Sequence, residues 1–120
     1  MTDFRGPPSG AQSTPLFKGN NRGNVVAAVT LDYSRFPTQE VTLTANTTVT
    51  ITGLPLGRAT WVQLHVNQDA TGGRTLVIAG ALTPSGGGLA LSPAANAVDI
   101  VSIFWSGAKL YAQVAGLAFA

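Results

Sequence analysis

The stretch from residue 60 to residue 79 carries the strongest local structure signal in the sequence. In its first half, apolar residues stand at every second position with polar residues between them: Val62, Leu64 and Val66 alternate with Gln63, His65 and Asn67. A period of two is typical of a half-buried β-strand. Asp69, Gly72 and Gly73 then form a turn sequence, and β-branched residues resume over 75–79. We therefore predict two strands joined by a tight turn, which is a β-hairpin.

Other segments carry the same strand signals. Residues 25–31 read as a first strand, and residues 40–45 and 48–52 read as a second hairpin with threonines on its outer face. Residues 98–105 are apolar on both faces, which is typical of a central strand, and 109–115 pairs back on it through a short turn. With about eight strands and no convincing helix, the pattern predicts an all-β fold, an antiparallel β-sandwich or jelly-roll-like domain.

The first part of the chain differs from the rest. Residues 1–23 are rich in Pro, Gly and Ser and have no periodicity, so we expect an extended N-terminal arm followed by the β-domain at 24–120. Within the arm, Phe4, Leu16 and Phe17 are apolar. They are either incidental residues of a floppy terminus or anchors by which the arm docks on a partner surface.

Composition narrows the function classes. The 120 residues suffice for one domain with a core, and charged residues make up only 10% of the chain. The net charge of +2 is scattered, which argues against nucleic acid as a partner. No run approaches a membrane span, so we expect no membrane insertion, and the N-terminus lacks the pattern of a signal peptide. Cysteine is absent, which removes disulfides and thiolate chemistry.

Residues that could carry catalysis are few. His65 is the single histidine, and its place within a strand pattern favours a structural role. No cluster of metal-ligand type and no phosphate-binding loop accompanies it, so no metal and no cofactor is expected. A glycosidase would need two carboxylates facing each other. The candidates are Asp3, Asp32, Glu40, Asp69 and Asp99. Turn or loop roles explain Asp69 and Asp99 well enough, so we predict that the protein is not an enzyme.

Aromatic side chains are the remaining candidates for a binding site. Trp61, Trp105 and Tyr111 could stack on the apolar faces of sugar rings. The alternative is that Trp105 and Tyr111 flank the last turn and pair across it, which would only stabilise the fold.

Four segments occur in an order that resembles a β-rich module of tailed-bacteriophage virion proteins, which occurs in tail fibres, receptor-binding appendages and related surface proteins. The segments are 43–52, 68–76, 94–101 and 105–111, and the resemblance covers about residues 40–120. Leu110 stands where the family typically has a polar residue.

The resemblance implies a non-enzymatic structural virion protein that is assembled in the host cytoplasm. Its partners would be other virion proteins of the capsid or tail, and it would form a homo-oligomer, with a trimer favoured. Because only a short arm precedes the module, a small appendage, fibre or capsid-decoration subunit is expected. The first alternative is a carbohydrate-binding module that recognises a host surface glycan. A depolymerase is the weakest alternative, since the sequence offers little support for a hydrolytic site.

Overall fold

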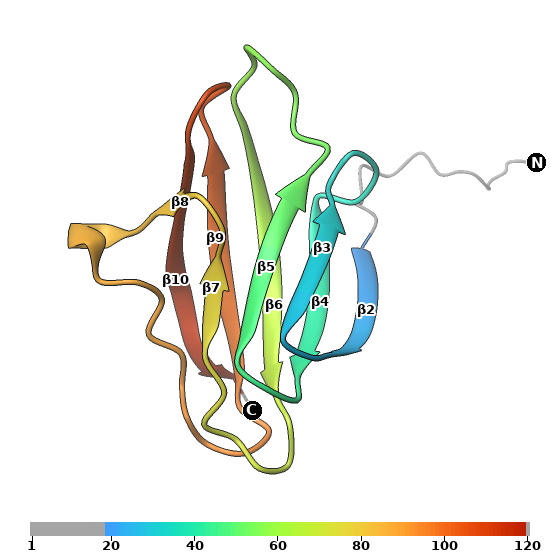
Figure 1. Cartoon of the computed structure of the whole chain (residues 1–120), viewed down its shortest axis with the longest axis vertical. Coiled ribbons are helices and arrows are strands. Elements are labelled where there is room, and N and C mark those ends of the chain that lie inside the picture. The colour runs from blue at the N-terminus through green and yellow to red at the C-terminus, as the bar shows by residue number, and fades with distance from the viewer. Residues whose placement is uncertain (1–18, 120) are drawn as a thin grey trace, which may run out of the picture.

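The computed structural model describes residues 19–119, and these residues form an all-β domain (Figure 1). The all-β fold predicted from the sequence is therefore confirmed, with nine strands where about eight were expected. One short 3-10 turn, Pro84–Gly86, follows the seventh of them along the chain. The strands are β2 (Gly19–Val25), β3 (Ala28–Asp32), β4 (Thr38–Leu43), β5 (Thr47–Thr52), β6 (Thr60–Gln68), β7 (Leu76–Ile78), β8 (Ala81–Leu82), β9 (Val98–Trp105) and β10 (Leu110–Phe119).

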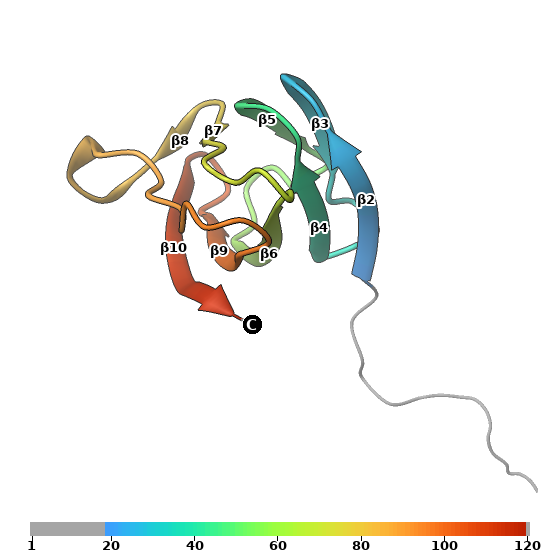
Figure 2. The same cartoon turned by 90° about the horizontal axis from the view of Figure 1, so that it is seen from below.

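The strands form two sheets that lie face to face, as the view along the strands shows (Figure 2). The larger sheet has six strands in the order β2-β4-β6-β9-β10-β8, and the smaller has three in the order β3-β5-β7. Each sheet turns one side to the other and one side outward, so the chain must bury alternate residues of nearly every strand.

From β2 to β8, successive strands alternate between the two sheets. The chain thus winds around the core, and from β2 to β7 each strand pairs in parallel with the strand two places further along the chain. Five of the seven strand pairings are parallel, and only β6 with β9 and β9 with β10 are antiparallel. The antiparallel arrangement predicted from the sequence is therefore wrong for most of the fold.

Short connections between strands of different sheets explain this winding. Between β2 and β3 only Val26 and Ala27 are left to turn the chain, and Ala27 adopts a left-handed conformation with φ of 55°. Such a turn brings the two strands to opposite sides of the core, so that they contact each other through side chains and find hydrogen-bond partners elsewhere. The predicted hairpins 40–45/48–52 and 60–68/75–79 are wrong for this reason, because β4 and β6 lie in one sheet while β5 and β7 lie in the other.

The hairpin predicted at the end of the chain is present. β9 and β10 pair antiparallel, with Trp105 opposite Leu110 across the turn. As predicted for a strand that is apolar on both faces, β9 is central, between β6 and β10.

The six-stranded sheet begins earlier in the chain than predicted. The arm was expected to extend to residue 23, but β2 already pairs with β4 from Gly19 onward. The predicted strand 25–31 is in fact the last residue of β2, the Val26–Ala27 turn and most of β3.

The core lies between the sheets. Its most completely buried apolar side chains come from both sheets, which agrees with the inward positions predicted on the alternating strands. They are Leu31, Val41, Leu43, Val49, Leu64, Val66, Val101 and Ile103.

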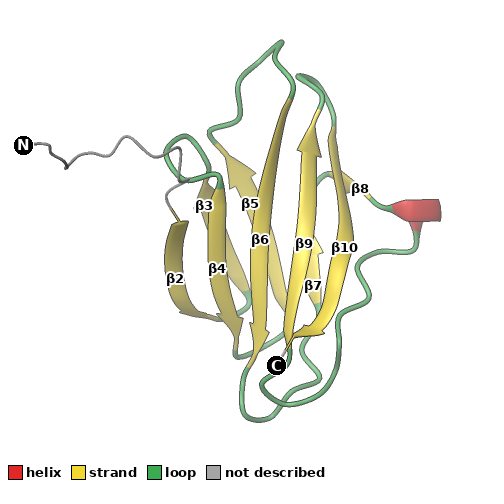
Figure 3. Ribbon diagram, turned by 180° about the vertical axis from the view of Figure 1, so that it is seen from behind, coloured by secondary structure: helices red, strands yellow, loops and turns green. Residues whose placement is uncertain are grey.

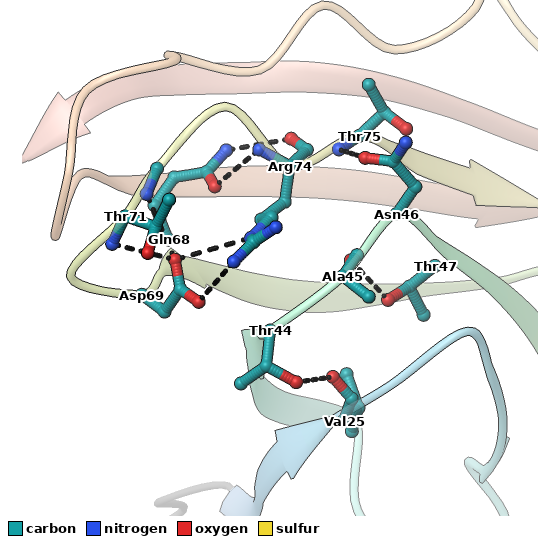
Figure 4. Close-up of polar contacts among 11 residues, drawn as sticks. Val25, Thr44, Ala45, Asn46, Thr47, Gln68, Asp69, Thr71, Arg74 and Thr75 are labelled. Atoms are coloured by element: carbon teal, nitrogen blue, oxygen red, sulfur yellow. Dashed lines mark hydrogen bonds and ion pairs between the residues drawn. The ribbon is translucent and has the colours of Figure 1, made fainter.

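The loop between β6 and β7 is held by side-chain hydrogen bonds (Figure 4). The buried amide of Gln68 accepts a hydrogen bond from the Arg74 N–H at 2.9 Å and donates to the Arg74 carbonyl oxygen at 2.9 Å. Asp69 Oδ1 accepts from the N–H groups of Thr71 and Gly72, which is the backbone-binding role predicted for a turn aspartate.

Candidate functional site

Three aromatic rings lie side by side on the outer face of the six-stranded sheet. The pairing register places Phe104 of β9 directly opposite Trp61 of β6 and also opposite Tyr111 of β10. The ring centroids are 4.6 Å apart for Trp61 and Phe104 and 6.1 Å apart for Phe104 and Tyr111. Trp61 is 65% exposed and Tyr111 39% exposed, while Phe104 is half-buried between them. We name these three residues the aromatic row.

The aromatic row borders an open groove of about 390 Å³. The groove lies over β6, β9 and β10, the strands that face the reader in Figure 3, and the chain around β8 completes it. The residues that line it are Trp61, Leu82, Thr83, Pro84, Ser102, Phe104, Tyr111, Ala112 and Gln113.

A row of polar side chains runs next to the aromatic row. Because residues two apart on a strand share a face, the register places Ser102 on the same face as Phe104, with Gln63 opposite it on β6 and Gln113 opposite it on β10. We name Gln63, Ser102 and Gln113 the polar row. Amides and hydroxyls both donate and accept hydrogen bonds, so the site combines flat apolar rings with adjacent neutral hydrogen-bonding groups.

The structure brings together two of the three aromatic residues singled out in the sequence. Trp105 follows Phe104 directly on β9, so its side chain points to the opposite side of the sheet. There its indole N–H donates to the carbonyl oxygen of Pro55, and its ring packs against the core. Its pairing partner across the last turn is Leu110, while Tyr111 pairs with Phe104. Trp105 is therefore not part of the aromatic row.

The acidic, basic and histidine side chains of the described residues do not line the groove. None of the carboxylates and neither His65 nor any cation is among the groove-lining residues. Asp99 is buried and binds backbone N–H groups, and the Glu40 carboxylate accepts a hydrogen bond from the Asn67 amide at 2.7 Å. No three His, Cys, Asp or Glu side chains within residues 19–119 are placed to hold a metal ion.

The pKa shifts have local structural causes. The Arg74 guanidinium, 3.0 Å from Asp69 Oδ2, and the Gly72 N–H lower the pKa of the Asp69 carboxyl. The N–H of Ser34 lowers the pKa of Asp32. Burial raises the pKa of the Tyr33 phenol, whose hydroxyl donates to the Gln63 carbonyl oxygen. All three residues stabilise turns or the core, and none of them points to proton-transfer chemistry in the groove.

The three predicted docking residues, Phe4, Leu16 and Phe17, lie outside the described residues. The described chain begins at Gly19 in β2, which is the edge strand farthest from β8 in the six-stranded sheet. The groove is built on the other half of that sheet, over β6, β9, β10 and β8. Between residues 19 and 119 there is no helix of the length and apolar character that a membrane crossing requires.

The sequence pattern did not identify Phe104 or the polar row. A signal for Phe104 was present, because the alternation in 98–105 puts it on one face and Trp105 on the other. Which of the two aromatic residues accompanies Trp61 depends on the register between β6 and β9, and a single strand carries no information on register.

Comparison with protein families gives one match. Residues 28–110, more than half of the chain, match the family described as "Putative phage tail fibre C-terminal domain". The match runs from the start of β3 to the start of β10 and includes Trp61 and Phe104. No curated protein and no solved structure matches the chain significantly. The resemblance to phage virion modules is thereby confirmed, and the chain belongs to the phage tail fibre C-terminal domain family.

Proposed function

We propose that this tail fibre domain binds carbohydrate on the host cell surface through the groove at the aromatic row. As a member of its family the chain is a structural component of a bacteriophage virion and associates with other virion proteins. The observation that carries the proposal is the exposed row of Trp61, Phe104 and Tyr111 with neutral hydrogen-bonding groups beside it. We further propose that the domain works by binding alone, without catalysis.

The physical basis is the match between the row and a sugar ring. One face of a pyranose carries C–H groups, which stack on aromatic rings, while its hydroxyls point outward from the ring edge. Tryptophan and tyrosine supply a large rigid contact area at little cost in side-chain entropy. Trp61, at 65% exposure, leaves apolar surface in water that a ligand would cover.

Replacing Trp61 by alanine tests the proposal. On an array of bacterial surface glycans, we expect the purified domain to bind, and Trp61→Ala to weaken binding roughly tenfold or more, as truncation of a central aromatic anchor does. Trp61→Phe keeps a ring and should retain part of the affinity. Val77→Ala, which shortens an exposed apolar residue on the outer face of the other sheet, should bind like the unchanged protein. A folded domain that binds no glycan, or a Trp61→Ala variant with full affinity, would contradict the proposal.

We propose a second function for the other side of the molecule, namely docking on the virion through the N-terminal segment. The observation that favours it is that the described chain begins at the β2 edge, on the half of the sheet that does not carry the groove. A partner bound there would leave the groove accessible. Phe4, Leu16 and Phe17 would supply the apolar contacts, and the region before residue 19 would act as the arm.

Serine substitution of the three arm residues tests docking. In phage particles carrying Phe4→Ser, Leu16→Ser and Phe17→Ser together, we expect much less of this protein per particle, measured by quantitative immunoblot. Purified, the triple variant should unfold at the same temperature as the unchanged chain. Alanine at residues 12–14, which are polar, is the matched control and should not reduce incorporation. Normal incorporation of the triple variant would exclude this docking mode.

Finer aspects of the virion role are proposals as well. We propose a homo-oligomer, with a trimer favoured, that is assembled in the host cytoplasm. Low charge content and several large exposed apolar side chains support association with other subunits. A tail fibre role is favoured by the family, and a small appendage or a capsid decoration remains as an alternative proposal.

A further inference from the structure

We infer that the groove selects neutral sugars over acidic ones, and that the polar row is what determines which neutral sugar fits. This inference rests on the proposed carbohydrate function of the same groove. It assigns a ligand class, uncharged pyranoses, and three specificity-determining residues. Ser102 and Gln113 line the groove, and Gln63 lies opposite Ser102 at its border.

The groove is lined by uncharged side chains. Its nine lining residues include no lysine, arginine, histidine, aspartate or glutamate. Arg58 and Lys109 are the cations nearest in sequence to the aromatic row, and neither lines the groove. Lys109 instead lines a separate hollow together with Trp105, on the opposite side of the sheet. Arg74 is paired with Asp69 beyond the other end of β6.

A charged sugar would lose hydration in this groove. A uronic or sialic acid carries a carboxylate, which must give up water when it enters an apolar groove. That loss is offset only where a cation or several N–H groups meet the carboxylate. Beside its three aromatic rings, the groove offers only neutral polar side chains, namely the Gln113 amide and the hydroxyls of Thr83 and Ser102. An acidic sugar would therefore lose hydration without gaining an ion pair.

A neutral sugar would gain hydrogen bonds in the same groove. A sugar hydroxyl is both a donor and an acceptor, and so are the side chains of glutamine and serine. The polar row lies one side-chain step along the strands from the aromatic row, with Ser102 between Gln63 and Gln113. A pyranose stacked on the rings would therefore direct the hydroxyls at one edge toward these three groups. The orientation of those hydroxyls, axial or equatorial, would decide how many hydrogen bonds form.

Matched pairs of oligosaccharides test the inference. The probes are cellotriose with the β1,4-linked trisaccharide of glucuronic acid, and α1,4-galactotriose with trigalacturonic acid. In each pair the backbone linkage is the same and only the carboxylates differ. By isothermal titration calorimetry or NMR titration of the full chain at low salt, we expect at least one neutral member to bind about tenfold or more tightly than its acidic partner.

A charge-altering variant gives a second measurement. Gln113→Lys places a cation at the rim of the groove and should raise the affinity for the acidic trisaccharides by about tenfold at low salt, an effect that added salt removes. Val77→Lys adds the same charge on the outer face of the other sheet and should leave the preference unchanged.

The possible outcomes distinguish the inferred preference for neutral sugars from the proposed carbohydrate binding itself. Acidic members that bind the unchanged protein as tightly as their neutral partners would overturn the inference while leaving carbohydrate binding in place. If none of the four trisaccharides binds, the inference is also overturned. Carbohydrate binding as such is decided independently by the glycan array and Trp61→Ala.

Discussion

Alanine at residue 72 is expected to destabilise the domain far more than alanine at residue 73, although both glycines have left-handed backbone angles. The φ angle is 76° at Gly72 and 73° at Gly73, so each substitution carries a conformational cost of about 1–2 kcal/mol. Of these two glycines, only Gly72 has no room for a side chain. A Cβ atom there would lie 2.5 Å from the Pro93 carbonyl oxygen and 2.8 Å from the Ala95 nitrogen, whereas nothing lies within 4 Å of one at Gly73.

The contact at Gly72 joins two distant segments. The loop after β6 packs on the loop before β9, where the Gly73 N–H donates to the Pro93 carbonyl oxygen and the Asn96 N–H donates to the Asp69 carbonyl oxygen. Both neighbours of the added carbon are backbone atoms, so relief requires the two loops to separate. We expect Gly72→Ala to lower the free energy of unfolding by about 3 kcal/mol or more.

Equilibrium urea unfolding of the two variants measures this difference. Gly73→Ala is the matched control, since it shares the conformational cost but has space for its side chain. The difference between the two unfolding free energies reports the close packing of the loops. Equal unfolding free energies for the two variants would mean that the loops do not pack as closely as described.

Replacing Asp99 by alanine is expected to lower the free energy of unfolding by about 2–4 kcal/mol, because two backbone N–H groups lose a charged acceptor. The Asp99 side chain projects from β9 into the interior, and the residue is only 2% exposed. Its Oδ2 accepts from the Ser92 N–H at 2.6 Å, and its Oδ1 accepts from the Ala118 N–H at 2.7 Å. The carboxylate thus ties the loop before β9 to the end of β10.

The variant Asp99→Asn separates the contribution of the carboxylate charge from that of the side-chain shape, because asparagine has nearly the same shape without the charge. It keeps one acceptor oxygen and should lose less stability than Asp99→Ala. Hydrogen exchange gives the local measurement, because the amides of Ser92 and Ala118 should lose protection in the alanine variant more than those of the core strands. A loss below about 1 kcal/mol, or unchanged protection at those two amides, would show that the carboxylate is not their essential partner.

The strands could be predicted from the sequence, but most of their pairings could not. A segment such as 48–52 shows its buried face through alternation, and Val49 is indeed fully buried. Alternation is the same whether two strands joined by a short turn bond to each other or face each other across a core. The choice depends on contacts with distant strands, for example β4 with β6, and these lie outside any local window.

The candidate site shows the same limit. Trp61 and Tyr111 could be identified from the sequence as aromatic residues available for stacking, and both border the groove. Trp105 was grouped with them because it is a tryptophan close to Tyr111 in the chain. Its side of the sheet follows from the register of β9 against two other strands, and that register brings Phe104 into the aromatic row instead. The Pro55 contact that explains Trp105 spans 50 positions of the chain.

β2 forms one edge of the six-stranded sheet, and the groove lies toward the other edge. This arrangement has a mechanical consequence. Suppose that the domain is attached to the virion through the segment before β2 and to a glycan through the groove, as proposed above. A force that pulls virion and cell apart would then cross the sheet at right angles to its strands. It passes in series through the β2–β4, β4–β6 and β6–β9 ladders. Adhesion under flow would then be limited by the weakest of these ladders. Because the β2–β4 register shifts between Asn21 and Gly23, we expect this ladder to yield first.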